Sequence, residues 1–239
     1  MSGHSKWNNI KRTKGKADAA KAASFTKIGR ELAVAVKMGG PDPDSNSRLR
    51  DIIAKAKAAN IPNDNISRSI KKAAGELSAI NYEAIVYEGY GPGGSAVIVD
   101  TLTDNKNRTV GDIRHIFDKY GGSMGTTGCV SFMFETKGVL ILEKTAKMDD
   151  DEIMMTALDA GAADIAVSGD VYEIYTDSGS LSAVREKLEA QGFAFLSGDV
   201  ERIPSNYVSL DADTLERFNN MVEKFEELDD VQNVFYNVE

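Results

Sequence analysis

Cysteine is almost absent from this sequence of 239 residues, since Cys129 is the only one. A single cysteine excludes an intrachain disulfide framework and a zinc site built from several cysteines. We interpret Cys129, which lies just before an apolar stretch, as a small buried residue rather than a nucleophile. The two histidines, His4 and His115, are far apart and match no metal-ligand or catalytic-triad spacing. The sequence therefore predicts no metal site, no cofactor and no enzymatic activity.

Long apolar runs are missing as well. No stretch approaches the roughly 18 apolar residues that would span a bilayer, and the beginning of the sequence lacks the apolar core of a signal peptide. We therefore expect a cytoplasmic protein with no membrane partner. A hydrophobic fraction of 42% and a charged fraction of 27% nevertheless predict folded domains with buried cores.

Positive charge is scarce overall and concentrated at one end. The net charge is -9, but residues 1–78 hold 16 Lys and Arg against 7 Asp and Glu, a net of +9. Residues 79–239 hold the remaining 12 and 30, a net of -18. The sequence therefore joins a basic module to an acidic body, and an anionic partner such as nucleic acid would relieve the repulsion within the basic module.

Residues 1–15 are expected to form an arm. Between Gly3 and Lys16, five basic residues and no acidic residue surround the only tryptophan, Trp7. Lys and Arg can neutralise phosphates, and an indole ring can stack on a base. The alternative is that the arm is an ordinary solvated terminus that Trp7 anchors to the body. We predict that the residues that bind nucleic acid are the cations of this arm, its tryptophan and two cations of the following helix: Lys6, Trp7, Lys11, Arg12, Lys14, Lys16, Lys27 and Arg30.

Three helices are expected after the arm. Apolar residues at spacings of three and four predict a helix from residue 16 that ends at Gly39 and Gly40. Asn46 or Ser47 can cap a second helix, and a third runs over residues 63–75. Short connections between them indicate a small helical bundle.

From residue 79 the sequence becomes rich in β-branched and aromatic residues, and it predicts strands over residues 82–88 and 95–103. The glycines of residues 89–94 between them match the dinucleotide fingerprint as a string. We reject a nucleotide site because a strand follows where a helix is needed, and because Pro92 has no N–H to offer a phosphate. A glycine-rich hairpin is the better interpretation.

The next segment is expected to contain a polar loop at residues 104–108. We expect Thr109 to cap a helix that closes at Gly121, residues 121–128 to form a second flexible glycine-rich loop, and residues 130–134 to form a strand. The polar loop is interpreted as a binding or turn segment, because it shows no pattern of a catalytic base or a metal site.

Residues 138–203 predict a complete unit of their own. Its elements alternate in the ferredoxin-like order of strand, helix, two strands, helix and strand. The acidic residues 149–152 lie at the predicted start of its first helix and are interpreted as helix caps, not metal ligands. A last helix and strand after residue 204 find no partners in this unit and could complete the sheet begun at residue 82. We therefore predict three domains: 1–78, 79–137 plus 204–239, and the inserted 138–203.

Five short motifs spread along the chain are distinctive: Gly3-His4-Ser5-Lys6-Trp7, Phe25-Thr26-Lys27 with Arg30-Glu31-Leu32, Tyr87-Glu88-Gly89-Tyr90-Gly91-Pro92-Gly93-Gly94, Asp104-Asn105-Lys106-Asn107-Arg108-Thr109, and Gly121-Gly122. Together they closely resemble the YebC family, and the resemblance covers essentially the whole chain. It implies an α+β fold in which an N-terminal three-helix domain is followed by two α+β (ferredoxin-like) domains, one inserted in the other. The family includes bacterial proteins and a mitochondrial activator of the translation of a cytochrome oxidase subunit.

Two functions remain open after this resemblance. Family members are usually described as cytoplasmic DNA-binding regulators of transcription, which is the function we expect first. The alternative is a translation factor that binds rRNA or mRNA on the ribosome and activates or un-stalls protein synthesis. The sequence shows no helix-turn-helix or other base-reading motif, and its charge does not distinguish DNA from RNA. We expect a monomer whose acidic domains could contact ribosomal or other proteins.

Overall fold

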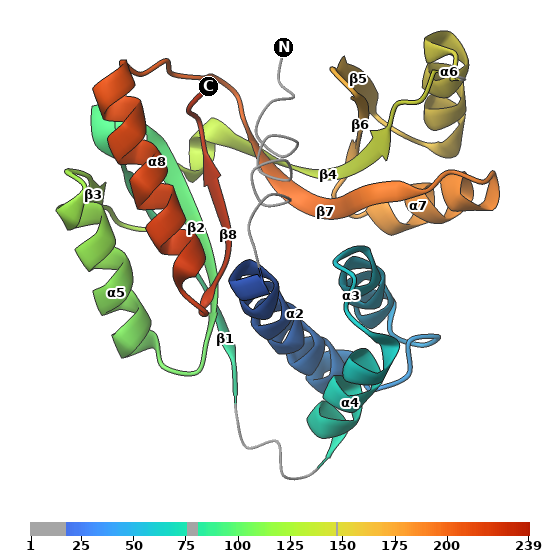
Figure 1. The fold of residues 1–239 in the computed structure, drawn as a ribbon, viewed down its shortest axis with the longest axis horizontal. Helices are drawn as coiled ribbons and strands as arrows, with labels where there is room; N and C mark the ends of the chain where they lie inside the picture. Colours follow the sequence, from blue (N-terminus) through green and yellow to red (C-terminus); the bar gives the residue numbers. More distant parts are fainter. Residues whose placement is uncertain (1–17, 76–80, 147) are drawn as a thin grey trace. The chain divides into compact units, whose positions relative to one another are not determined.

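The computed structural model describes residues 18–75, 81–146 and 148–239 (Figure 1). Its described residues divide into two compact units, one formed by residues 18–135 and 204–239 and the other by residues 136–203. Helices and antiparallel sheets occur together, which confirms the α+β class. The three-domain boundaries predicted from the sequence stay a prediction. Within the described ranges, none of the helices combines the length and the apolar composition needed to cross a membrane.

Three helices open the larger unit: α2 (Asp18–Gly39), α3 (Ser47–Ala58) and α4 (Asn63–Ala74). They bury a common apolar cluster that includes Leu32 and Leu49, as the spacings of three and four predict. Asn46 caps α3, because its side-chain oxygen accepts a hydrogen bond from the Leu49 N–H at 3.0 Å. Its side-chain amide also donates to the Ala35 carbonyl at 2.9 Å. One buried asparagine therefore fixes the start of α3 against α2.

The first sheet has the strand order β3-β1-β2-β8. Its strands are β1 (Glu83–Tyr90), β2 (Ala96–Thr103), β3 (Ser123–Met124) and β8 (Val231–Tyr236), while α5 (Lys106–Lys119) and α8 (Ala212–Glu227) pack on one face. The rings of Phe117 and Phe225 meet edge to face there, with centroids 5.0 Å apart. The last helix and strand thus complete the sheet begun by β1, as predicted.

The opposite face of the first sheet is covered by a shorter segment. Ala96, Ile98 and Phe235 form an apolar cluster with Val130, which precedes the one-turn 3-10 helix η2 (Ser131–Met133). Alternate residues of β2 therefore enter different cores, with Val97 and Val99 under the helices and Ala96 and Ile98 on this side.

The smaller unit has the ferredoxin-like order that the sequence predicts. Its sheet order is β5-β6-β4-β7, and two helices cover one face. The Asp149 carboxylate caps α6 by accepting hydrogen bonds from the N–H groups of Asp151 and Glu152, and Gly161 ends α6 with a φ of 106°. The elements are β4 (Phe134–Glu143), α6 (Asp150–Ala160), β5 (Asp164–Ser168), β6 (Val171–Asp177), α7 (Leu181–Ala190) and β7 (Phe195–Pro204).

Three local predictions are wrong. Residues 104–108 are not a loop, because Asn105 already caps α5 and Thr109 is buried within its first turn. Residues 130–134 are not a strand, because η2 interrupts the extended backbone and β4 begins only at Phe134. Residues 121–128 are not simply a flexible loop, since they contain β3, which pairs with β1.

Candidate nucleic-acid interface

Six of the eight predicted binding residues lie outside the described residues, namely Lys6, Trp7, Lys11, Arg12, Lys14 and Lys16. Their role stays a prediction. The structure places the other two, Lys27 and Arg30, on α2, one turn apart.

Lys27 and Arg30 both reach groups that lie far away in the sequence. The Lys27 ammonium donates a hydrogen bond to the Glu226 carbonyl at 2.7 Å. Burial lowers the pKa of Lys27, against the opposing effect of the nearby Glu226 carboxylate. Arg30 donates to the Leu102 carbonyl at 3.1 Å and forms an ion pair with Asp230. These contacts hold α2 against the first sheet and α8, so both cations have a structural role.

Asp230 is the centre of a polar cluster. Its side chain is only 8% exposed and accepts hydrogen bonds from Arg108 at 2.8 Å, from the Thr109 hydroxyl at 2.7 Å and from the Thr103 hydroxyl at 3.2 Å, besides the ion pair with Arg30. Burial acts to raise the pKa of Asp230, but the hydrogen bonds outweigh it and lower the pKa to about 2. The carboxylate is therefore ionised at neutral pH and fully partnered.

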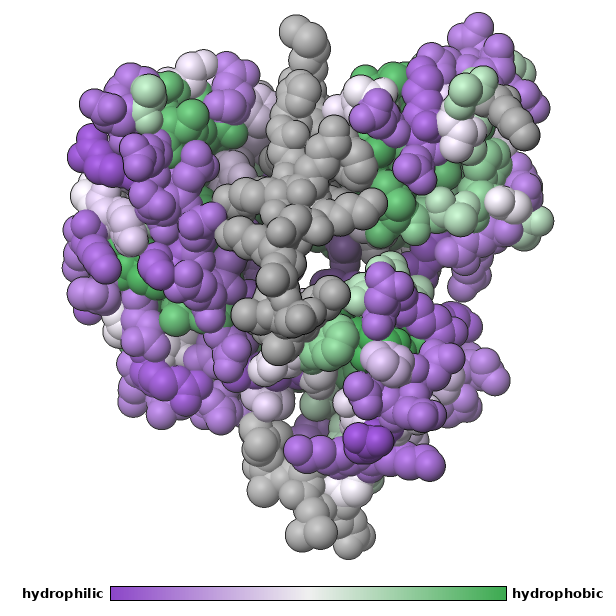
Figure 2. Space-filling model, in the orientation of Figure 1, coloured by the Kyte–Doolittle hydropathy of each residue, from purple (hydrophilic) through white to green (hydrophobic). Residues whose placement is uncertain are grey.

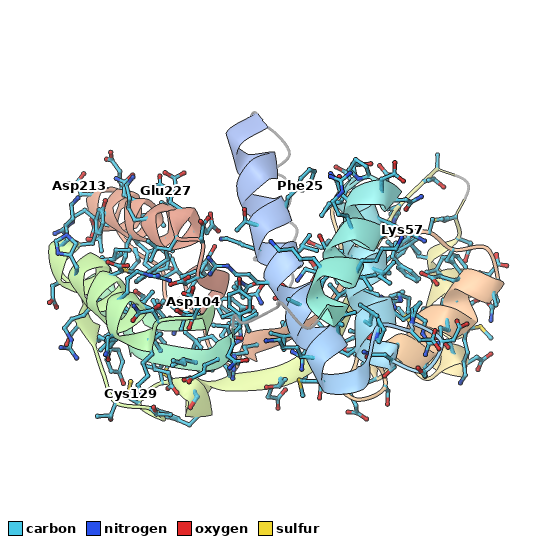
Figure 3. The ribbon with its side chains drawn as sticks, turned by 90° about the horizontal axis from the view of Figure 1, so that it is seen from below. Phe25, Lys57, Asp104, Cys129, Asp213 and Glu227 are labelled. Carbon is cyan, nitrogen blue, oxygen red and sulfur yellow. The ribbon has the colours of Figure 1, made fainter. Side chains whose placement is uncertain are left out.

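A cavity of about 390 Å³ adjoins this cluster (Figure 3 labels Asp104 and Glu227 of its wall). Its lining contains five carboxylates but only two guanidinium groups, and this excess of negative charge repels phosphate. The cavity is therefore a poor site for nucleic acid. The charged residues that line it are Asp104, Asp112, Glu227, Asp229, Asp230, Arg30 and Arg108.

One group of exposed cations lies instead on α4. Arg68, Lys71 and Lys72 are all exposed, and their spacing of three and four places them on one side of the helix. Hydrophilic residues cover most of the surface around α4 on the face shown in Figure 2. Lys71 and Lys72 lie in the last turn of α4, where positive charge interacts favourably with the helix dipole. Their presence there therefore also has a structural explanation. The sequence prediction omitted these three residues, although their spacing could have identified them.

The remaining candidates from the sequence are Cys129 and the glycine-rich residues 89–94. Burial raises the pKa of the Cys129 thiol, which disfavours the reactive thiolate. In the part of the chain that the structure describes, no three His, Cys, Asp or Glu side chains are grouped so that they could hold a metal ion. The glycine-rich residues before β2 form a hairpin between β1 and β2 and not a phosphate loop before a helix, as expected.

Two family domains match consecutive parts of the chain. Residues 5–76 match the domain described as the TACO1/YebC protein N-terminal domain, and residues 82–238 match the TACO1/YebC second and third domain. The chain belongs to the TACO1/YebC family.

Curated relatives in this family are similar over their full length. A protein of Clostridium botulinum (strain Okra / Type B1) is 57% identical over 100% of this chain and 97% of its own. A protein of Acetivibrio thermocellus is 57% identical over 99% of this chain and 98% of its own. Both carry the name "Probable transcriptional regulatory protein".

One solved structure has a similar fold. The crystal structure of a conserved hypothetical protein from Aquifex aeolicus is similar with a TM-score of 0.84 and 42% identity, and the match covers 94% of this chain and 92% of that one. The family motif at residues 104–109 now has a physical explanation here, since it supplies Asn105 as a helix cap and Arg108 and Thr109 as partners of Asp230.

Proposed function

We propose that this TACO1/YebC family member is a nucleic-acid-binding regulator of gene expression that acts on DNA as a transcriptional regulator. The observation that carries the proposal is the charge division of the chain, +9 over residues 1–78 and -18 over residues 79–239. The names of its relatives support the same function. Lys and Arg side chains release condensed counterions when they contact phosphates, and this release supplies affinity without sequence preference.

The binding surface is proposed to combine the arm with one side of α4. The arm contributes the cations and the tryptophan between residues 6 and 16, and α4 contributes Arg68, Lys71 and Lys72. Lys27 and Arg30 act indirectly, because their contacts with Glu226 and Asp230 hold α2 in place. The acidic body would keep nucleic acid away from other surfaces and is free to contact proteins. We also propose that the protein acts as a monomer in the cytoplasm and has no enzymatic activity.

A translation factor that binds RNA on the ribosome is the second candidate. One observation favours it: an aromatic side chain, Phe132, is 76% exposed on a stretch of the chain that carries no charge. Aromatic rings stack on unpaired bases, which are abundant in folded RNA and rare in duplex DNA.

Sequencing of nucleic acid crosslinked to the protein in cells tests the proposal and separates its two forms. Enrichment of chromosomal DNA would support transcriptional regulation, and enrichment of rRNA or mRNA would support the translation factor. A variant in which the arm cations are replaced by Ala is the control. Recovery of equal amounts of nucleic acid with this variant would contradict both forms.

A further inference from the structure

Phe132 is the most exposed large hydrophobic side chain among the described residues. It lies in η2, within residues 121–134, which contain no Asp, Glu, Lys or Arg although 27% of the chain is charged. Residues 89–99, which form the adjacent hairpin, are also without charge. The two segments are neighbours in space because β3 pairs with the end of β1, with Ser123 opposite Tyr90.

A buried carboxylate holds the backbone around Phe132 in place. Glu88, which is 3% exposed, accepts hydrogen bonds from the N–H groups of Gly128 at 2.8 Å, Val130 at 3.0 Å and Ser131 at 2.8 Å. The Glu88 carbonyl accepts a fourth hydrogen bond from the N–H of Gly125 at 2.8 Å. Side chain and backbone of one residue therefore organise seven consecutive residues of this segment.

The neighbours of Phe132 are buried while Phe132 is not. Val130 is fully buried, and Met133 and Phe134 pack against the same apolar cluster beneath the first sheet. In Figure 3 Cys129 lies on the side of this sheet opposite Glu227 of α8, in agreement with its contacts. The residues on both sides of Phe132 pack inward. The exposure of its ring therefore results from the fold and not from a loose loop.

Close packing fixes the segment further. The Tyr90 hydroxyl donates a hydrogen bond to the Cys129 carbonyl at 3.1 Å, and the Ser205 N–H donates to the Met133 carbonyl at 2.8 Å. A Cβ atom at Gly125 would lie 2.5 Å from the Cys129 sulfur, so this position has no room for a side chain. These contacts hold the backbone on both sides of Phe132.

The residues that precede Phe132 in the sequence are polar but neutral. Thr126 and Thr127 are exposed beside exposed glycines, and Tyr90, which is 42% exposed, is the other large side chain of the two segments on the surface. Residues 121–134 offer a flat ring, hydroxyl groups and bare peptide groups, and they carry no charge to pair with a phosphate. They also lack the several exposed apolar anchors that form the core of a protein–protein interface.

We propose that Phe132 stacks on an unpaired nucleobase, which the hydroxyl and peptide groups of residues 123–128 contact along its edge. This inference rests on the nucleic-acid binding of the proposed function and belongs with its RNA-binding form, because it names a second contact of the same nucleic acid. The arm and α4 hold phosphates, whereas this surface holds a base and therefore selects single-stranded or looped nucleic acid over a duplex.

The test uses the full chain and a fluorescein-labelled RNA of about 20 nucleotides and mixed sequence, either single-stranded or annealed to its complement. Loss of one base stack corresponds to a roughly 5- to 150-fold weaker single-strand affinity for Phe132→Ala. The salt dependence should not change, because no phosphate contact is lost. Phe132→Trp should bind at least as tightly as the wild type, whereas Phe132→Leu should bind as weakly as Phe132→Ala. Met38→Ala, which truncates another exposed hydrophobic side chain (71%), should have no effect.

Three results would overturn the inference while leaving the proposed function in place. They are wild-type affinity of Phe132→Ala for the single strand, an equal loss of affinity for the duplex, and wild-type affinity of Phe132→Leu. The last would indicate an apolar contact of the kind that a protein pocket provides. Absence of any RNA or DNA binding by the wild-type protein would instead contradict the proposed function itself, and this inference with it.

Discussion

At the scale of single residues, Asp230 connects parts of the chain that are far apart in the sequence. Its carboxylate pairs with Arg30, 200 positions earlier, and with Arg108, 122 positions earlier. An ionised carboxylate with so little exposure is stable only while these partners remain, and the partners in turn depend on it. In the sequence Asp230 is one of many acidic residues. In the structure it holds α2 and α5 together.

Asp230→Asn should lower the free energy of unfolding by about 2 to 3 kcal/mol at pH 7, which corresponds to a pKa lowered from 3.8 to about 2. The folded pKa is the lower one, so the stabilisation is complete above the unfolded pKa and is lost as the pH falls towards 2. The difference between wild type and variant should therefore shrink below about pH 4. Urea unfolding at pH 7, 5, 4 and 3 would measure it.

The neighbouring Asp229 provides the control, because it is exposed. Asp229→Asn should change the free energy of unfolding by less than about 0.5 kcal/mol at any of these pH values. If Asp230→Asn were equally harmless at pH 7, the cluster around Asp230 would not stabilise the protein.

At the scale of elements, the turn from β3 to β4 depends on Glu88 in β1. Glu88→Gln keeps the shape of the side chain but replaces one accepting oxygen by an N–H₂ group that cannot accept a hydrogen bond. We expect a loss of about 1–3 kcal/mol of stability because buried N–H groups lose their acceptor. Hydrogen exchange should become faster at the amides of Gly128, Val130 and Ser131.

Glu83→Gln is the matched change on an exposed position of the same strand and should leave this exchange unaltered. Burial acts to raise the pKa of Glu88, but its backbone hydrogen bonds outweigh burial and lower the pKa, so the carboxylate is ionised at neutral pH. Unchanged exchange in Glu88→Gln would show that the turn is held by its apolar contacts alone.

The sequence predicts most elements of this fold because their signals are local. The stripe of α2, the cap Asn46 and the order of strands and helices in residues 138–203 all depend on neighbours within a few positions. The wrong predictions concern segments whose conformation depends on partners far away in the sequence. Thr109 has the properties of a helix cap but is buried, where its hydroxyl donates a hydrogen bond to Asp230. Residues 130–134 have the composition of a strand, but hydrogen bonds to the Glu88 carboxylate hold their first residues in a 3-10 turn.

The predicted binding site shows the same division between local and distant signals. Charge and position predict that Lys27 and Arg30 bind nucleic acid. Their partners Glu226 and Asp230 lie about 200 positions away, where no local pattern indicates them. The basic side of α4 is a local pattern and was available from the sequence. It is the part of the proposed interface that lies within the described residues.

The variant Arg68→Gln/Lys71→Gln/Lys72→Gln should weaken binding to all nucleic acid sequences alike. If each side chain contacts a phosphate, the slope of log K against log salt should fall by about 2 to 3. The matched control is Lys106→Gln/Arg114→Gln/Arg217→Gln, which removes three exposed positive charges from α5 and α8. Fluorescence anisotropy with a labelled oligonucleotide would compare the two, and an equal loss in both variants would point to net charge rather than to α4.

At the scale of the whole molecule, the chain separates charge along its length. A net of -18 over residues 79–239 would oppose nucleic acid, and a net of +9 over residues 1–78 would attract it. The structure uses some of the basic charge internally, because Lys27 and Arg30 face acceptors of the acidic part. The affinity for phosphates must then come from the cations that remain exposed, and salt must weaken it strongly.

The salt dependence of nucleic acid affinity shows whether the basic arm binds phosphates. It is measured in the full chain and in a variant with Lys6, Lys11, Arg12, Lys14 and Lys16 replaced by Ala. The affinity of the wild type should fall steeply between about 50 and 200 mM salt, and the variant should bind weakly, with a slope reduced by about 0.7 to 0.9 for each lost phosphate contact. An affinity that salt does not change, or a variant that binds as tightly as the wild type, would contradict phosphate binding by the arm.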